Sequence, residues 1–198
     1  MIKALILDAD GVLIVNAEKF SKKFSAEYGV PIEKINSFFD GPFRECILGA
    51  ADLKEVISPY LADWGWTEGA PVFLEYWFKE EHHLDESLIA YVKDLRTRGV
   101  RCFVASNQEK HRAEYMLEKM GFKDIFEKVY VSANLGHKKP SMEFYEKMYK
   151  DFPETQKDEI IFWDDTPGNV IAAKEFGIKA ELYSSFQNFK HTMQNYFM

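Results

Sequence analysis

The stretch Leu5-Ile6-Leu7-Asp8-Ala9-Asp10-Gly11-Val12-Leu13 contains an apolar run that ends abruptly in two carboxylates, one residue apart. A short apolar run closed by a turn signal is typical of a buried strand. The two acids then lie at the carboxyl end of that strand, where open α/β sheets hold their ligands. Because neighbouring buried carboxylates repel each other and lose solvation, they favour a positive group between them. A divalent cation with oxygen ligands fits that position.

Five short apolar runs recur along the chain, with helical patterns between most of them. The runs are residues 2–7, 100–105, 128–131, 160–163 and 179–182. The helical segments in this rhythm are residues 87–98, 110–120, 141–150 and 168–176. Three of these segments are followed by a glycine in C-cap position, namely Gly99, Gly121 and Gly177. Strands that alternate with helices in this way predict an α/β fold, a Rossmann-like parallel sheet flanked by helices.

Residues 16–86 break this rhythm, because they show no comparable strand pattern. Helices are expected over residues 18–28, 32–39, 52–64 and 71–81, separated by turns with glycine and proline. The sequence therefore predicts an α/β core of residues 1–15 and 87–198, with a helical insertion at 16–86. The insertion is rich in aromatic residues, which we expect to form its core more than a substrate platform. A terminal helix is expected within residues 184–198.

Composition and charge limit the classes of partner. The 198 residues, 46% of them hydrophobic, indicate one domain, or one domain with a modest insertion. A net charge of −7 argues against a nucleic-acid partner, since phosphate contacts need clustered Lys and Arg, but it leaves small anionic substrates open. Cys46 and Cys102 show no metal-ligand spacing, so neither zinc nor a disulfide framework is expected.

The same apolar runs bear on the cellular location. Asp8 and Asp10 interrupt the first run before a secretory signal could form, and no run approaches the roughly 20 apolar residues of a membrane helix. We therefore expect a cytoplasmic protein with no membrane partner. The sequence predicts no particular oligomeric state.

Polar residues also follow the other predicted strands. Ser106 and Asn107 come after the second strand, and Asp164-Asp165-Thr166 after the fourth. The loop Gly136-His137-Lys138-Lys139-Pro140 carries two lysines between them. In a doubly wound sheet these ends converge at one edge. Carboxylates, a hydroxyl and a lysine together indicate a magnesium site that handles a phosphoryl group.

These motifs resemble the haloacid dehalogenase-like hydrolase superfamily, most of whose members are phosphatases. Four motifs occur in the family's order: Asp8-Ala9-Asp10-Gly11-Val12, Ser106, Lys139-Pro140 and Asp164-Asp165. The resemblance covers the whole chain, and the insertion at 16–86 looks like the family's helical cap. It implies a Mg²⁺-dependent phosphomonoester hydrolase acting on a small phosphorylated metabolite, similar to a sugar phosphate.

The resemblance also implies a role for each motif residue. Asp8 matches the nucleophile that forms an aspartyl-phosphate, and Asp10 matches the general acid and base. Asp8, Asp10 and Asp165 match the metal-binding positions, Asp10 through its backbone carbonyl. Ser106, Asn107 and Lys139 match the groups that bind phosphate, with Lys139 also neutralising the nucleophile. Asp164 is a candidate water-mediated ligand, and Asn169 stands where many relatives carry a further acid.

Other interpretations of these residues remain. Asp8 to Gly11 and Asp164 to Thr166 also fit an ordinary turn and a helix N-cap. Lys138 is expected on the surface, since Lys139 directly precedes Pro140 as in the family pattern. Asp10 favours phosphate esters over dehalogenation, because a departing halide needs no proton. A phosphomutase, a dehalogenase and a non-catalytic binding protein on the same fold are the alternatives.

Overall fold

The computed structural model describes residues 1–15 and 18–197, and its centre is a five-stranded sheet. The strands are β1 (Ala4–Leu7), β2 (Arg101–Ser106), β3 (Lys128–Val131), β4 (Ile160–Asp164) and β5 (Lys179–Leu182). All neighbours pair in parallel, in the order β3-β2-β1-β4-β5. The predicted α/β fold with a Rossmann-like parallel sheet is therefore confirmed.

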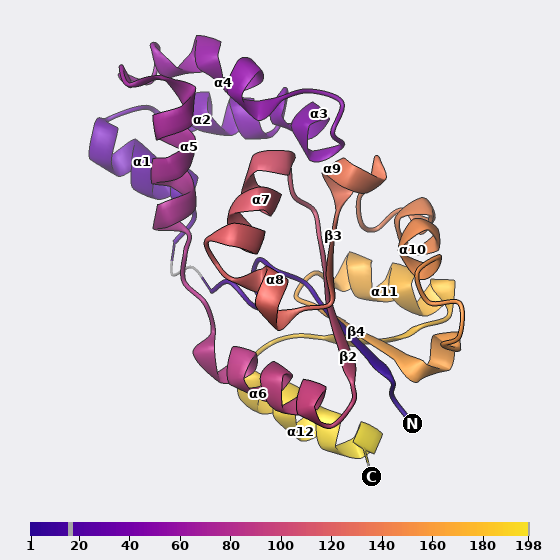
Figure 1. Ribbon diagram of the computed structural model, residues 1–198. Helices are drawn as coiled ribbons and strands as arrows, with labels where there is room; N and C mark the ends of the chain where they lie inside the picture. The colour runs from indigo at the N-terminus through magenta and orange to yellow at the C-terminus, as the bar shows by residue number, and fades with distance from the viewer. Residues whose placement is uncertain (16–17, 198) are drawn as a thin grey trace.

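Helices cover both faces of the sheet (Figure 1). They are α6 (Glu86–Thr97), α7 (Lys110–Glu118), α8 (Phe122–Ile125), α9 (Ser132–Leu135), α10 (Met142–Tyr149), α11 (Pro167–Phe176) and α12 (Phe186–Phe197), with a 3₁₀ turn η1 at Lys157–Glu159. Alternate side chains of β1 pack against opposite helix layers. Leu5 and Leu7 pack with α6, α7 and α12, whereas Ala4 and Ile6 pack with α10 and α11. Because both faces are buried, the strand is apolar throughout instead of alternating.

Five further helices form a group of their own beside this core, at the upper left of Figure 1. They are α1 (Phe20–Tyr28), α2 (Ile32–Phe39), α3 (Phe43–Ile47), α4 (Leu53–Leu61) and α5 (Gly69–Glu80). The group has its own hydrophobic cluster, in which Phe24, Trp64 and Phe73 are buried and pack on one another. This confirms that many of the aromatic residues serve packing. The predicted start of the insertion, at residue 16, lies outside the described residues.

The chain passes between the core and the helical group through two adjacent segments. The Val15 N–H donates to the His83 carbonyl, and the Asp85 N–H donates to the Leu13 carbonyl. A second contact lies farther along, where Gly49 of the helical group approaches Ala133 of α9 so closely that a Cβ at Gly49 would lie 2.1 Å from the Ala133 carbonyl oxygen. The helical group thus contacts the core beyond the two connecting segments as well.

Three short helices, α3, α8 and α9, were not predicted. Each has only four or five residues, which is less than the span needed for a 3.6-residue periodicity to show. The helices and strands that the sequence predicts are all present. Their bounds differ from the predicted ones by no more than three residues. The helix expected over 52–64 ends at Leu61, and the following residues form a turn.

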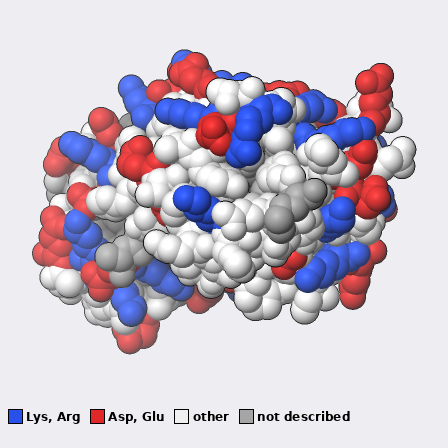
Figure 2. Space-filling view, turned by 90° about the horizontal axis from the view of Figure 1, so that it is seen from below, with Lys and Arg blue, Asp and Glu red and all other residues white. Residues whose placement is uncertain are grey.

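Charges on the surface are mixed in sign. Figure 2 shows one face, on which Lys and Arg lie among Asp and Glu and do not gather into one basic field. Within the described residues, none of the helices combines the length and the apolar character needed to span a bilayer.

Asp52 provides a test of how the helical group is held. Its carboxylate accepts from the N–H of Lys54 as the N-cap of α4, and its oxygen lies 3.0 Å from Nε2 of His111 on α7. We expect Asp52→Ala to lower the free energy of unfolding by about 1 kcal/mol at pH 7, measured by urea titration. Asp63→Ala, at an exposed acid beyond α4, is the control.

The effect should depend on pH in a defined direction. Partial burial alone would raise the pKa of Asp52, but the hydrogen bonds from His111 and Lys54 lower it overall from 3.8. Because the folded-state pKa is the lower one, the stabilisation is present above pH 3.8 and is lost as the pH falls through the folded-state value. A difference between wild type and variant that stays constant from pH 7 to pH 3 would contradict this assignment.

Candidate active site

Three neighbouring strands bring their carboxyl ends to one place. Leu7 of β1 pairs with Val104 of β2 and with Trp163 of β4, so Asp8, the residues around Ser106, and Asp164 follow at the same edge. The Asp8 N–H extends this pairing by donating to the Trp163 carbonyl at 2.9 Å. The sequence prediction that these strand ends converge is therefore confirmed by the fold itself.

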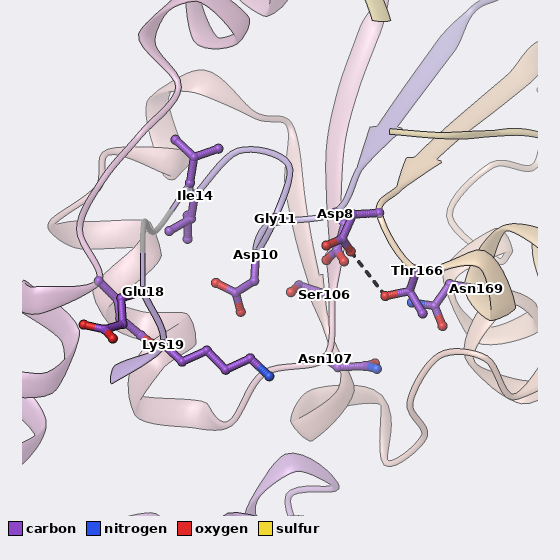
Figure 3. A pocket seen from close by; sticks show the side chains of 13 residues that line it. Asp8, Asp10, Gly11, Ile14, Glu18, Lys19, Ser106, Asn107, Thr166 and Asn169 are labelled. Carbon is purple, nitrogen blue, oxygen red and sulfur yellow. Dashed lines mark hydrogen bonds between the residues drawn. The ribbon is translucent and has the colours of Figure 1, made fainter. Parts of the chain in front are cut away.

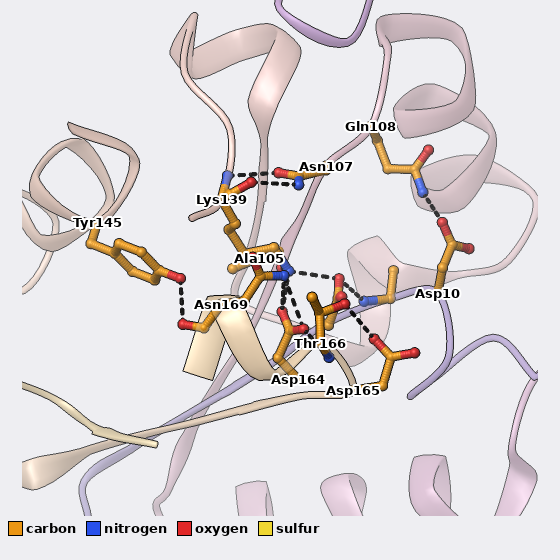
Figure 4. Close-up of polar contacts among 12 residues, drawn as sticks. Asp10, Ala105, Asn107, Gln108, Lys139, Tyr145, Asp164, Asp165, Thr166 and Asn169 are labelled. Atoms are coloured by element: carbon orange, nitrogen blue, oxygen red, sulfur yellow. Dashed lines mark hydrogen bonds and ion pairs between the residues drawn. The ribbon is translucent and has the colours of Figure 1, made fainter. Parts of the chain in front are cut away.

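A buried lysine lies between two of the acids. Lys139 Nζ is 2.6 Å from Asp164 Oδ2 and 2.9 Å from Asp8 Oδ1, and the Lys139 side chain is 1% exposed (Figure 4). It also donates to the carbonyl oxygen of Ala105 at 2.7 Å. All three donor positions of the ammonium are thus used. Lys138, in contrast, is exposed, as expected.

The side chain of Asn107 holds the backbone of Lys139. Its Nδ2 donates to the Lys139 carbonyl at 2.9 Å, and its Oδ1 accepts from the Lys139 N–H at 2.8 Å. This pair fixes the loop that carries the lysine. The amide group of Asn107 therefore supports the backbone of Lys139, and the phosphate contact that the family resemblance implies for Asn107 stays a prediction.

Asp8, Asp164 and Asp165 form a carboxylate cluster. Each offers an oxygen atom, and these atoms lie within 4.8 Å of one another. Asp164 is fully buried and accepts from the Thr166 N–H and from Asn169 Nδ2, whereas Asp165 is exposed to the cavity. Such hard oxygen donors fit Mg²⁺, and the open position of Asp165 leaves room for it. The side chain of Asp10 lies outside this cluster.

Asp8 and Asp10 are harder to ionise than an ordinary aspartate, because the pKa of each is raised. Burial raises the pKa of Asp8 to about 7, although the Lys139 ammonium opposes this and Asp164 adds to it. Desolvation by the surrounding protein also raises the pKa of Asp10, although its side chain opens into the cavity described below, and the Arg112 charge and the Gln108 hydrogen bond oppose this. A bound cation would favour the charged forms, because it adds positive charge beside them.

Gln108 positions the second acid, and it was not foreseen from the sequence. Its Nε2 donates to Oδ2 of Asp10. Arg112, nearly buried on α7, lies near enough for its charge to act on Asp10. Gln108 lies two residues beyond Ser106, and Arg112 lies in the first turn of α7. Neither belongs to one of the four motifs, so the sequence pattern does not single them out.

Gly11 is required by a close approach. Its φ of 77° is in the left-handed region, and a Cβ there would lie 2.1 Å from Oδ2 of Asp165. Only glycine combines this conformation with this contact at no steric cost. The turn after β1 therefore packs directly against the acid that follows β4.

A cavity of about 620 Å³ opens over these groups (Figure 3). Of the predicted site residues, Asp8, Asp10, Ser106, Asn107 and Asp165 line it, whereas Lys139 lies beneath the carboxylates. Glu18, Lys19 and Glu81 complete its wall on the side of the helical group. A phosphoryl group placed there would meet the carboxylates of Asp8 and Asp10 and the hydroxyl of Ser106 within one cavity.

The comparisons with known proteins agree with this geometry. The sequence profile of the family described as haloacid dehalogenase-like hydrolase matches residues 4–182. The chain therefore belongs to that family. A HAD family enzyme of Bacteroides thetaiotaomicron shares its fold, with a TM-score of 0.82, 21% identity and coverage of 97% of this chain and 98% of the other. A predicted HAD-like family hydrolase of Porphyromonas gingivalis has a TM-score of 0.80, 20% identity and coverage of 100% and 98%.

Curated relatives match over shorter stretches. The sesquiterpene phosphatase astK of Aspergillus oryzae is 32% identical over 94 residues, which are 48% of this chain and 47% of that protein. The drimenol cyclase drtB of Aspergillus calidoustus is 25% identical over 122 residues, 60% of this chain and 23% of the cyclase. The matched stretches thus span less than half of each of these relatives.

Lys139 should be essential to stability as well as to the site. Removing it leaves two buried carboxylates without their partner, so we expect Lys139→Met to lower the free energy of unfolding by about 3–5 kcal/mol in metal-free buffer. The exposed neighbour gives a matched control, since Lys138→Met should change the free energy of unfolding by less than about 0.5 kcal/mol. Equal unfolding free energies for the two variants would mean that the ion pairs do not stabilise the fold.

Proposed function

We propose that this haloacid dehalogenase-like hydrolase is a Mg²⁺-dependent phosphatase that cleaves small phosphomonoesters through an aspartyl-phosphate on Asp8. The observation that carries the proposal is the position of Asp8, which is bound to Lys139, lies within the acidic cluster and opens into a cavity that it shares with Asp10. Nucleophile, charge partner and candidate acid are thereby assembled at one point.

The contacts of Asp8 indicate which oxygen reacts. Its Oδ1 accepts from the Ala9 N–H at 2.7 Å and faces Lys139 Nζ at 2.9 Å. We therefore assign the attack to Oδ2. Bond formation from Oδ2 to phosphorus breaks the bond from phosphorus to the ester oxygen, and the electron pair leaves with that oxygen.

Asp10 then completes the proton transfers. In its protonated form, which desolvation by the surrounding protein favours, it gives its proton to the departing ester oxygen and releases the alcohol. As a carboxylate it next takes a proton from water, which attacks the phosphorus of the aspartyl-phosphate. Inorganic phosphate and the Asp8 carboxylate result. The hydrogen bond from Gln108 keeps Asp10 in place for both steps.

The oxygens of Asp8 and Asp165, with the backbone carbonyl of Asp10, would hold Mg²⁺, and Asp164 lies beside them. The ion would offset the negative charge of the phosphoryl group. Ser106, which lines the cavity, would donate to a phosphoryl oxygen, and Lys139 would balance the charge of Asp8. These assignments follow the family pattern of the motif residues.

Two relatives support the reaction class. One matched protein is a sesquiterpene phosphatase. The Bacteroides enzyme has also been solved in complex with magnesium and inorganic phosphate, in a structure with a TM-score of 0.80 and 21% identity. We further propose that residues 16–86 act as a cap over the site, since Glu18, Lys19 and Glu81 contribute to the cavity wall.

Replacing the nucleophile is the direct test. We expect Asp8→Asn to lower the rate of phosphate release from p-nitrophenyl phosphate more than about a thousandfold, and chelation of Mg²⁺ to do the same to wild type. Asp63→Asn, an exposed acid, should keep wild-type turnover. Substantial turnover by Asp8→Asn, with its fold intact by circular dichroism, would refute the mechanism.

Asp10→Asn should separate the two steps. The p-nitrophenolate ion leaves without a proton, so the variant should release a first equivalent quickly in stopped-flow absorbance. Steady-state turnover should then fall by about 10²–10⁴, since hydrolysis of the aspartyl-phosphate lacks its base. A steady-state turnover rate of Asp10→Asn equal to that of the wild type would mean that Asp10 is not the base for hydrolysis of the aspartyl-phosphate.

A further inference from the structure

A second, smaller cavity lies beside Asp10, between the helical group and the core. Its volume is about 170 Å³, and it shares Asp10, Glu81 and Asn107 with the larger cavity. The leaving oxygen of a phosphate ester must be near Asp10 if Asp10 protonates it. The group attached to that oxygen therefore has this smaller cavity next to it.

One wall of the smaller cavity is made of aromatic rings from the helical group. Phe39 of α2, Phe43 of α3 and Trp77 of α5 line it, with ring centroids 5.2 to 5.7 Å apart. Ile47, one turn beyond Phe43 on α3, extends the wall. Phe39, Phe43 and Ile47 are only half-buried, so part of their apolar surface faces the cavity and does not pack into the hydrophobic core.

The charged side chains of the opposite wall already have partners within the protein. The carboxylate of Glu81 accepts from Trp77 Nε1 at 2.9 Å and lies 3.7 Å from the guanidinium of Arg112. Arg112 donates to the carbonyls of Phe78 and Glu81 at 2.9 and 3.2 Å. This pair thus fastens the end of α5 to α7.

The remaining polar side chains of the lining are occupied as well. Gln108 donates to Asp10, and the Glu109 carboxylate accepts from the first N–H groups of α7. The amide of Asn107 is bound to the Lys139 backbone. A ligand in the cavity therefore meets aromatic surface together with polar groups that are already hydrogen-bonded.

We propose that this cavity receives the alcohol part of the substrate, and that this alcohol is a compact apolar group, not a polyhydroxylated sugar. The proposal rests on the phosphatase function and deepens it. Apolar cavities of about 150 Å³ bind benzene, so 170 Å³ suits a six-membered ring or a short branched chain. Sugar hydroxyls placed there would lose water against the aromatic rings, and the polar side chains beside them already hold hydrogen bonds within the protein, which disfavours a sugar.

Two matched esters test this preference. Cyclohexylmethyl phosphate and glucose 6-phosphate are both primary phosphates on a six-membered ring, and they differ chiefly in the ring oxygen and hydroxyls. We expect kcat/KM to be at least about tenfold higher for the cyclohexyl ester, since apolar contacts of this size give discrimination of that order. Phe43→Ala should remove most of the preference, and Phe43→Leu should retain part of it. Val72→Ala, at an exposed position on α5, is the control.

Binding to Asp8→Asn separates this proposal from the phosphatase function. Calorimetry in the presence of Mg²⁺ should show tighter binding of the cyclohexyl ester, whether or not any ester is hydrolysed. Preferential binding without turnover by wild type would support the cavity and contradict the phosphatase. Equal or tighter binding of glucose 6-phosphate, or no binding of either ester, would overturn the assignment of an apolar alcohol.

Discussion

The ion pairs of Lys139 with Asp8 and Asp164 are the interaction on which the rest of the site depends. Three strand ends place two carboxylates side by side at a buried edge, and such an arrangement is costly unless a cation lies between them. Lys139 meets that need for one pair of oxygens. Asp165, on the exposed side, leaves the cluster with residual negative charge toward the cavity. Lys139 therefore neutralises the buried side of the cluster, and the side that faces the cavity can bind a cation.

Much of the sheet and part of the site follow from sequence pattern alone. The three central strands, β1, β2 and β4, are short and largely apolar runs buried on both faces, and the polar residue at the end of each marks the edge where ligands bind. Asp8, Ser106 and Asp164 are identified by that rule. The role of Asp164 as the buried partner of Lys139, with Asp165 left exposed, depends on which of two adjacent side chains points inward, and strand pattern does not decide this.

Residues that act through tertiary contacts escaped prediction. Gln108 reaches Asp10 across the end of the sheet, and Arg112 joins α7 to the end of α5, so neither contact has a local signal. The aromatic residues illustrate the same difficulty. Composition indicates a packed helical group, and Phe24 and Trp64 serve it, but only the arrangement of α2, α3 and α5 shows that Phe39 and Phe43 also face a cavity.

The two connections between core and helical group lie side by side, joined by hydrogen bonds of Val15 with His83 and of Asp85 with Leu13. The chain thus enters and leaves the inserted helices at one place beside the sheet, and the insertion interrupts no strand pairing. An insertion attached in this manner is free to change in length and sequence while the catalytic edge stays as it is. Asp10 bridges to Ile14 in the same turn, so the acid for which we propose the contact with the leaving alcohol lies next to the segment that leads into the insertion.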